Sequence, residues 1–349
     1  MKLFEATKKF KRFYLIAIVI IVAGLAIARS QFFTPAPKLS EIPVQQRAIS
    51  IIKEPIQPIP LHIDLNLNKV ALGEKLFNET KLSHNNNISC ASCHNLKTGG
   101  TDNLVYSFST SGTFTLVNTP TIFNVGFNFR QFWDGRSETL EEQIDGPLNS
   151  SHEMGSNWPE IISKLKQDPN YVSTFKQLYQ DSITRENTKD ALATFMRSLY
   201  TPNSRFDKYL RGDTNAITNE EKKGYSLFKN YGCISCHQGI NVGGNMFQKF
   251  GILNDYFANR GNITKSDSGR ANITQEPSDD RVFKVPSLRN VELTAPYFHD
   301  GSTKSLENAV TVMAKYQLGR TLSKEEIALI IKFLKTLTGE YQGKSLSSY

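Results

Sequence analysis

Apolar residues recur with helical spacing in four segments of the chain. The segments are residues 160–179, 185–200, 219–229 and 323–337. Each has the three- and four-residue periodicity of an amphipathic helix. Thr218 and Ser323 stand at the start of two of these segments, each with a glutamate three residues later, as in a capping box. No convincing run of alternating polar and apolar residues indicates a sheet. The pattern therefore predicts a mainly α protein with helices joined by long loops.

The N-terminal segment has a different pattern. Four basic residues between Lys8 and Arg12 precede an apolar run over residues 13–28 that no polar face interrupts. Residues 1–30 are therefore predicted to be a cleaved export signal or an uncleaved membrane anchor, and the pattern does not choose between them. Both interpretations place the rest of the chain in the periplasm, soluble or anchored to the inner membrane by residues 13–28. Prolines recur through residues 31–60, which are predicted to form an extended tether without a core.

Composition narrows the class of protein only a little. The chain has 349 residues, a formal net charge of +8, 39% apolar residues and 21% charged residues. These proportions exclude a wholly disordered chain. The length is that of about two domains. The excess positive charge is too dilute to indicate nucleic-acid binding.

The cysteines carry the clearest chemical signal. All four lie in two pentapeptides, Cys90-Ala-Ser-Cys93-His94 and Cys233-Ile-Ser-Cys236-His237. A Cys-x-x-Cys-His run is the attachment sequence of c-type haem. Two thiols one helical turn apart can bond to the porphyrin vinyl groups, and the adjacent imidazole then ligates the iron. Two disulfides, a thioredoxin-like redox pair and a four-cysteine zinc site are the alternatives, but none of them explains both histidines. The sequence therefore predicts two covalently bound haem c groups, with His94 and His237 as iron ligands.

The chain repeats itself around these two sites. A Gly-x-x-Leu-Phe pattern in a helical setting begins at Gly73 before the first site and at Gly224 before the second. After each site, a Pro-x-x-x-Asn-Val run is followed by Phe-x-Asp-Gly, in which x is Trp133 in the first copy and His299 in the second. The repeat predicts two homologous haem domains in tandem, residues 61–205 and 206–349, with the boundary inside residues 201–213.

The function of a haem depends on the ligand opposite its proximal histidine. No histidine or methionine lies between His94 and Pro120, so the loop after the first site offers that haem no second ligand. Met313 lies in a helical run after the second site. A methionine there is more often a core residue, but the haem in the same domain needs a ligand. Met313 is therefore predicted to bind the second haem iron, which would raise its potential and make it a good electron acceptor.

Several longer motifs carry a resemblance to a known family. They are Phe132-Trp-Asp-Gly-Arg136, Leu140-Glu-Glu-Gln143, Glu153-Met-Gly155, Val285-Pro-Ser-Leu-Arg-Asn290 and Ala295-Pro-Tyr-Phe-His-Asp-Gly301. Over about residues 72–337, the chain resembles the bacterial di-haem cytochrome c peroxidases, a family that also includes the MauG-type di-haem enzymes. The resemblance implies two homologous cytochrome c-like domains in tandem. It also implies reduction of hydrogen peroxide to water with two electrons from a small cytochrome c, a cupredoxin or a quinol.

The resemblance also assigns a direction of electron flow. In this family, electrons enter at the C-terminal haem and pass to the N-terminal haem, where peroxide binds. Residues 61–205 would then form the peroxidatic domain and residues 206–349 the electron-transfer domain. MauG-type enzymes have a tyrosine in the place of Met313, so Met313 favours the peroxidase branch. A MauG-like oxidase acting on a protein or organic substrate is one alternative, and a non-enzymatic di-haem electron carrier is another.

Three residues match functional positions of the family, two in its peroxide pocket and one between its haems. Glu153 matches its acid/base, and a carboxylate screened from water is suited to moving a proton between the two peroxide oxygens. Gln143 matches a glutamine that orients peroxide, and Trp133 matches the tryptophan between the two haems. The alternative for Glu153 is an ordinary surface carboxylate, and the alternative for Trp133 is core packing.

The family also binds one calcium ion between its domains, through an asparagine side chain and backbone carbonyls. The matching residues are Asn118, Thr294 and Pro296. Because calcium takes about 6–8 oxygen ligands, water would supply most of the others.

The chain departs from the family pattern in the loop after the first site. Many members have a histidine there that caps the peroxide iron until the second haem is reduced, whereas residues 108–114 contain none. The N-terminal haem is therefore predicted to be five-coordinate or water-ligated in the oxidised protein, unless His84 or His152 supplies the ligand. The sequence does not identify the electron donor, and it leaves open whether the protein is a homodimer.

Overall fold

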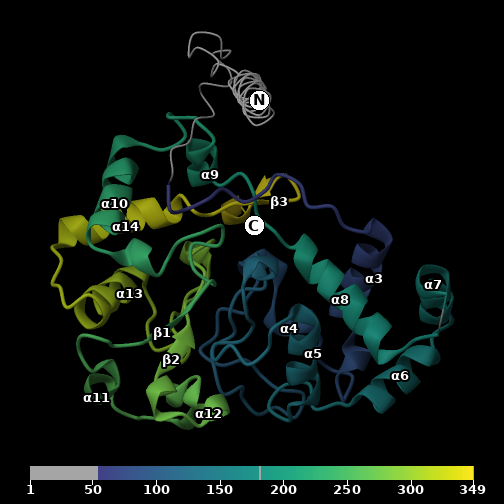
Figure 1. Cartoon of the computed structure of the whole chain (residues 1–349). Coiled ribbons are helices and arrows are strands. Elements are labelled where there is room, and N and C mark those ends of the chain that lie inside the picture. Colours follow the sequence, from purple (N-terminus) through teal and green to yellow (C-terminus); the bar gives the residue numbers. More distant parts are fainter. Residues whose placement is uncertain (1–53, 181, 349) are drawn as a thin grey trace, which may run out of the picture. The chain divides into compact units, whose positions relative to one another are not determined.

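The computed structural model describes residues 54–180 and 182–348 (Figure 1). The predicted signal or anchor, residues 1–30, lies outside these residues, as does most of the predicted tether. Within the described ranges, no helix combines the length and apolar character needed to span a bilayer.

The described chain is mainly helical, as predicted. Its α-helices are α3 (Leu67–Phe77), α4 (Cys90–Cys93), α5 (Leu140–Asn149), α6 (Trp158–Lys166), α7 (Pro169–Tyr179), α8 (Arg185–Ser198), α9 (Arg205–Leu210), α10 (Asn219–Asn230), α11 (Tyr256–Arg260), α12 (Ala271–Thr274), α13 (Leu306–Val312) and α14 (Lys324–Lys335). Two short antiparallel ladders pair β1 (Phe247–Lys249) with β2 (Val282–Lys284), and β3 (Glu340–Tyr341) with β4 (Lys344–Ser345).

Helix boundaries follow local signals in the sequence. Both predicted capping boxes are present, at Thr218 before α10 and at Ser323 before α14. The single helix predicted over residues 160–179 is wrong, because the chain breaks there into α6 and α7. Pro169 begins α7, with Asp168 as its N-cap. A proline has no N–H to continue the preceding helix and is favoured at a first helical position.

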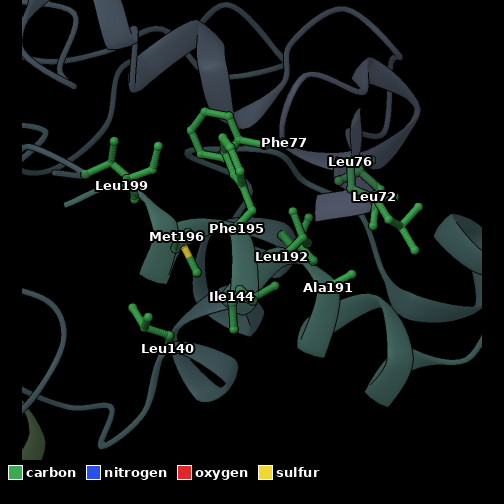
Figure 2. Close-up of a cluster of buried hydrophobic side chains, with 14 of the residues drawn as sticks. Leu72, Leu76, Phe77, Leu140, Ile144, Ala191, Leu192, Phe195, Met196 and Leu199 are labelled. Atoms are coloured by element: carbon green, nitrogen blue, oxygen red, sulfur yellow. The ribbon is translucent and has the colours of Figure 1, made fainter. Parts of the chain in front are cut away.

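A first hydrophobic core forms where α3 packs against α8, with α5 beside them. Figure 2 shows Leu72, Leu76 and Phe77 of α3 facing the same cluster as Phe195 of α8. Gly73 lies at the closest approach of the two helices, because a Cβ atom there would be 2.1 Å from the carbonyl oxygen of Ala191. Glycine is therefore required for this packing distance.

A second core repeats this arrangement with α10 and α14. A Cβ atom on Gly224 would lie 2.0 Å from the carbonyl oxygen of Leu329. Gly224 and Gly73 hold the same place in the two sequence repeats, so both copies of the pattern serve one type of helix contact. In Figure 1, α10, α13 and α14 lie together, apart from α3, α5 and α8.

The backbone also repeats after each Cys-x-x-Cys-His site. The φ angle is +63° at Asn124 and +59° at Asn290, and it is +69° at Phe132 and +73° at Phe298. Such left-handed conformations are uncommon for residues other than glycine. Their recurrence at matched positions shows that the two sequence repeats adopt the same local structure.

Each end of the described chain packs into the core of the opposite half of the sequence. Ile56 is 1% exposed and belongs to the second core, whereas Leu346 is 3% exposed and belongs to the first. The expectation that residues 31–60 have no core contacts is therefore wrong for this end of the segment. The expected boundary segment, residues 201–213, contains α9 with buried Phe206 and Asp207. The described residues, 54–180 and 182–348, all belong to one compact unit by their contacts.

Candidate functional site

The first Cys-x-x-Cys-His site occupies a single helical turn. Cys90 and Cys93 are the ends of α4, and His94 is its C-cap residue. The Nδ1 atom of His94 lies 3.2 Å from the carbonyl oxygen of Gly100. A neutral imidazole that donates from Nδ1 keeps Nε2 unprotonated for a metal. Burial lowers the pKa of His94, which favours this neutral form.

The second site has the same arrangement. Cys233 begins a 3₁₀ turn, η5 (Cys233–Ser235), and the Nδ1 atom of His237 lies 3.3 Å from the carbonyl oxygen of Val242. Burial lowers the pKa of His237 to about 4. Both histidines are therefore oriented by backbone carbonyls, as metal-ligating histidines commonly are.

The thiols do not have the chemistry of the alternative sites. All four are free. Burial raises the pKa of Cys90 to about 12 and that of Cys233 to about 11, whereas a redox-active Cys-x-x-Cys pair needs a lowered thiol pKa. No group of possible metal ligands among the described residues contains a cysteine. Two reduced thiols beside a histidine whose Nδ1 faces a backbone carbonyl fit covalent haem attachment instead.

Glu153 lies close to the first of these sites. Its side chain is half-buried, and burial raises its pKa although the charge of Arg136 opposes the shift. Burial raises the pKa of Cys93 to about 11, with a hydrogen bond from Ser107 opposing the rise and the charge of Glu153 adding to it. The N–H of Thr110 donates to the Glu153 carbonyl oxygen at 2.8 Å. The loop after the first site therefore packs on Glu153, without any histidine in that loop.

Gln143 lies on α5, and the segment that carries Glu153 hydrogen-bonds to the last turn of the same helix. The N–H of Met154 donates to the carbonyl oxygen of Pro147 at 3.0 Å, and positions 143 and 147 share one face of a helix. Gln143 is half-buried. Among the described residues, no hydrogen bond joins its side chain to Glu153, so a shared role of the two side chains stays a prediction.

Trp133 connects the two halves of the sequence. Its indole Nε1 donates to the carbonyl oxygen of Asn118 at 2.9 Å, and its own carbonyl accepts from the N–H of Lys284 at 2.8 Å. Its ring meets that of His299 edge to face, with centroids 6.4 Å apart. Trp133 also packs against a third, smaller core built from residues 256–316. It therefore serves packing between segments, and electron transfer remains a prediction.

His299 is held by acidic residues that the sequence analysis did not identify. Its Nε2 lies 2.7 Å from Asp267, and both side chains are 2% exposed. Asp267, His299 and Asp300 offer ligand atoms within metal-binding reach of one another. However, Arg260 pairs with Asp300 and, at 2.7 Å, with Asp267, so a cation already fills this cluster. Asp267 lies in a Gly-, Asn- and Ser-rich stretch without periodicity, which is why no local signal pointed to it.

The three predicted calcium ligands keep oxygen atoms available. Asn118 is buried, and its Nδ2 donates to the carbonyl oxygen of Leu104 at 2.7 Å, while no group among the described residues donates to its Oδ1. In the described part of the chain, the backbone carbonyls of Thr294 and Pro296 accept no hydrogen bond. Calcium prefers such oxygen ligands.

Three further residues, Met313, His84 and His152, are candidate ligands of the haem irons. Met313 is half-buried and begins a π-helical turn, η9 (Met313–Gln317), directly after α13. Turns of this type occur often at functional sites. His84 and His152 are both exposed, and their Nδ1 atoms contact Glu160 and the carbonyl oxygen of Phe114, respectively.

A mainly helical chain with two Cys-x-x-Cys-His sites of this geometry is a c-type cytochrome. A family model for di-haem cytochrome c peroxidase matches residues 67–215. The cytochrome c peroxidase Ccp of Escherichia coli (strain K12) is 47% identical over 82% of this chain and 62% of its own length. The cytochrome c551 peroxidase of Nitrosomonas europaea is 44% identical over 82% of this chain and 85% of its own length. The chain belongs to the di-haem cytochrome c peroxidase family.

A solved structure shows a related fold. A MauG-like protein associated with microbial copper homeostasis is 28% identical to this chain, with a TM-score of 0.71. The match covers 84% of this chain and 95% of that protein. The family and its fold are therefore supported from both sequence and structure.

Proposed function

We propose that this protein is a di-haem peroxidase that reduces hydrogen peroxide to water in the periplasm. The observation that carries the proposal is Glu153, a half-buried carboxyl with a raised pKa, whose charge acts on Cys93 of the first attachment site and whose carbonyl is bonded by Thr110 of the loop after that site. An electron carrier has no need for a proton-transferring group at that place, whereas cleavage of the peroxide bond does.

The cofactors would be two haem c groups in tandem cytochrome c-like domains. Cys90 and Cys93 would hold the first haem and Cys233 and Cys236 the second, through thioether bonds, with His94 and His237 as proximal ligands and Met313 as the second ligand of the second iron. When bound, the haems supply the iron at which peroxide is reduced and the electrons that reduce it. Hydrogen peroxide then takes up two electrons and two protons and leaves as two waters.

Within this scheme, Glu153 moves the proton. Its ionised carboxylate accepts a proton from one peroxide oxygen and returns it to the oxygen that departs as water. Burial raises the pKa of Glu153, which brings it closer to the pH at which both steps are efficient. The amide of Gln143, which can donate and accept, would orient peroxide.

Electrons would enter at the C-terminal haem and reach the N-terminal haem by way of Trp133. The name of the Nitrosomonas europaea relative, a cytochrome c551 peroxidase, supports a small cytochrome c as the donor, with a cupredoxin or a quinol as the other candidates. A MauG-like oxidase is the second candidate function. Identities of 44–47% to two named peroxidases, against 28% to a MauG-like protein, favour the peroxidase.

A calcium ion bound by Asn118, Thr294 and Pro296 would fix the segment around Asn118, whose carbonyl oxygen accepts the hydrogen bond from the Trp133 indole. The free Oδ1 of Asn118 and the two unpaired carbonyls support this site. Treatment of the holoenzyme with a calcium chelator is expected to lower its melting temperature and its turnover, and calcium should restore both. Unchanged melting with no calcium detected by elemental analysis would exclude the site.

The decisive experiment compares Glu153→Gln with Glu74→Gln in the holoenzyme. Turnover of peroxide with a reduced donor should fall by about 10²–10⁴-fold in Glu153→Gln, while both haems still accept electrons. Glu74 is an exposed carboxylate on α3 and serves as the matched control, with turnover unchanged. Full turnover in Glu153→Gln would overturn the assignment. A wild-type protein that accepts two electrons but never consumes peroxide would be an electron carrier.

A further inference from the structure

Lys284 is a buried cation without an anionic partner. It ends strand β2, and only 8% of its surface is exposed. No carboxylate or other acceptor pairs with its ammonium group anywhere in residues 54–180 and 182–348. The contrast is Arg289, which is also buried but pairs with Asp207 at 2.7 Å. Burial alone lowers the pKa of Lys284 to about 8. An unpaired buried charge is costly, so such groups normally have a partner.

The backbone of Lys284 lies between Trp133 and the second attachment site. Its N–H donates to the Trp133 carbonyl at 2.8 Å. Two residues later, the carbonyl of Pro286 accepts a hydrogen bond from the imidazole of His237. The preceding residue, Phe283, has its ring 4.5 Å from the His299 ring. Because successive side chains of a strand point to opposite faces, Lys284 lies on the face away from His299.

The ammonium group borders accessible space. In the described chain, two polar side-chain atoms are sealed from solvent without a partner, Ser156 Oγ and Asp207 Oδ2. The Nζ atom of Lys284 is not one of them, although it also has no partner. Lys284 is therefore buried as a residue, while its ammonium group is not completely sealed from solvent. This is the arrangement expected for a lysine that meets a ligand's negative charge.

We propose that Lys284 binds a haem propionate at the junction of the two haem sites. The proposal rests on the proposed function, because it requires haem at Cys90–Cys93 or at Cys233–Cys236. Thioether bonds hold a haem c by its vinyl groups, so its two propionates lie at another edge of the porphyrin and must find cations or water. A lysine binds such a carboxylate as a point charge. Either haem could supply it, and the chemistry is the same.

The expected consequence is electrostatic. A positive charge near a propionate favours the reduced iron, which carries one positive charge less than the oxidised iron. Lys284→Met should therefore lower the midpoint potential of one haem by about 59 mV. This shift corresponds to a change of about tenfold in the equilibrium constant of a one-electron reduction. The Lys284→Arg variant keeps the charge and should keep the potential close to that of the wild type.

The test is a spectroelectrochemical titration of both haems in the holoenzyme, with Lys249→Met as control. Lys249 is exposed on strand β1 and pairs with Val282 of β2, so it tests loss of a lysine from the same ladder. A lowered potential for one haem in Lys284→Met alone supports the proposal, and the haem that shifts identifies the source of the propionate. Potentials equal to those of Lys249→Met overturn it.

Two further measurements remove the ambiguous outcomes. Haem content, determined from the pyridine haemochrome spectrum, shows which of the two proposals has failed. A protein without two haems would contradict the proposed function itself, and not only the role of Lys284. If Lys284→Met does not fold, the propionate bending vibrations in resonance Raman spectra of the wild type and Lys284→Arg decide. A shifted vibration on replacing ammonium by guanidinium supports the contact, and identical spectra refute it.

Discussion

Trp133 and His299 hold the same place in the two sequence repeats, and in the folded chain their rings contact each other, with centroids 6.4 Å apart and planes inclined by 72°. Asn118 joins them from one side. Its N–H donates to the His299 carbonyl at 2.8 Å, and its carbonyl accepts from the Trp133 indole at 2.9 Å. The repeated motif thus brings its two divergent residues together.

Replacement of Trp133 by phenylalanine is expected to lower stability and slow electron transfer between the haems. The variant keeps an aromatic ring but loses the hydrogen bond to Asn118, which is worth about 1 kcal/mol. Trp158→Phe is the matched control, because its indole also donates a hydrogen bond, to Asp145. Stopped-flow oxidation of the half-reduced protein by peroxide measures the transfer. Equal rates in both variants would leave Trp133 with a packing role alone.

Replacement of Gly224 by alanine should destabilise the second core by about 1–3 kcal/mol, the usual cost of overpacking. The new methyl group would lie 2.0 Å from the carbonyl of Leu329, so α10 and α14 would have to separate. Gly126→Ala provides the control, since its nearest neighbour atoms are 3.6 Å away. Thermal melts of both holoenzymes test this. A Gly224→Ala protein as stable as wild type would show that the helices adjust freely.

The buried pair of Arg289 and Asp207 should be costly to break from one side. Both side chains are fully buried, 2.7 Å apart, and loss of one partner of a buried ion pair costs about 3–5 kcal/mol. Arg289→Met is therefore expected to lose that much in denaturant unfolding, whereas adding Asp207→Leu should recover part of it. The control is Lys332→Met, which removes an exposed pair with Glu220 worth less than about 1 kcal/mol. Strict additivity in the double variant would contradict this account.

Glu153 should give turnover an acidic limb and should cost stability at neutral pH. Burial raises its pKa above the ordinary value of 4.5, and only the ionised form can accept a proton from peroxide, so turnover falls as the pH is lowered through the raised pKa. The folded protein binds this proton more tightly than the unfolded chain does. The unfavourable contribution is therefore present at pH 7 and disappears as the pH falls below the unfolded pKa.

Glu153→Gln should accordingly raise the melting temperature at pH 7 and have little effect near pH 4, while the residual turnover loses its acidic limb. Paired melts at the two pH values and a pH–rate profile measure both effects. A melting temperature that is lower than wild type at pH 7 would show that the ionised carboxylate is stabilising.

The first haem should be open to exogenous ligands in the fully oxidised protein. The loop over residues 108–114 packs on Glu153 through Thr110 and offers no histidine. A high-spin ferric EPR signal that is consumed by peroxide before any reduction is expected. A low-spin signal for this haem would contradict the prediction, and its conversion to high spin in His84→Ala or His152→Ala would identify the capping residue.

Local signals in the sequence were enough for part of this structure. Periodicity and caps located α10 and α14, and the repeat located Gly73 and Gly224 before their shared role in helix packing was visible. The Arg289–Asp207 pair and the Asp267–His299 pair were not predictable, because their members are far apart in sequence and no periodic pattern relates them. The burial of Ile56 was missed because prolines on either side conceal any strand or helix pattern.

The crossed ends of the chain have a consequence for protein engineering and for comparisons within the family. Because Ile56 completes the second core and Leu346 the first, neither half of the gene encodes all of its own interior. A chimaera that exchanges the C-terminal half between relatives therefore has to carry residues 54–60 with it and leave residues 340–348 behind. A junction at residue 205 alone would join two incomplete interiors.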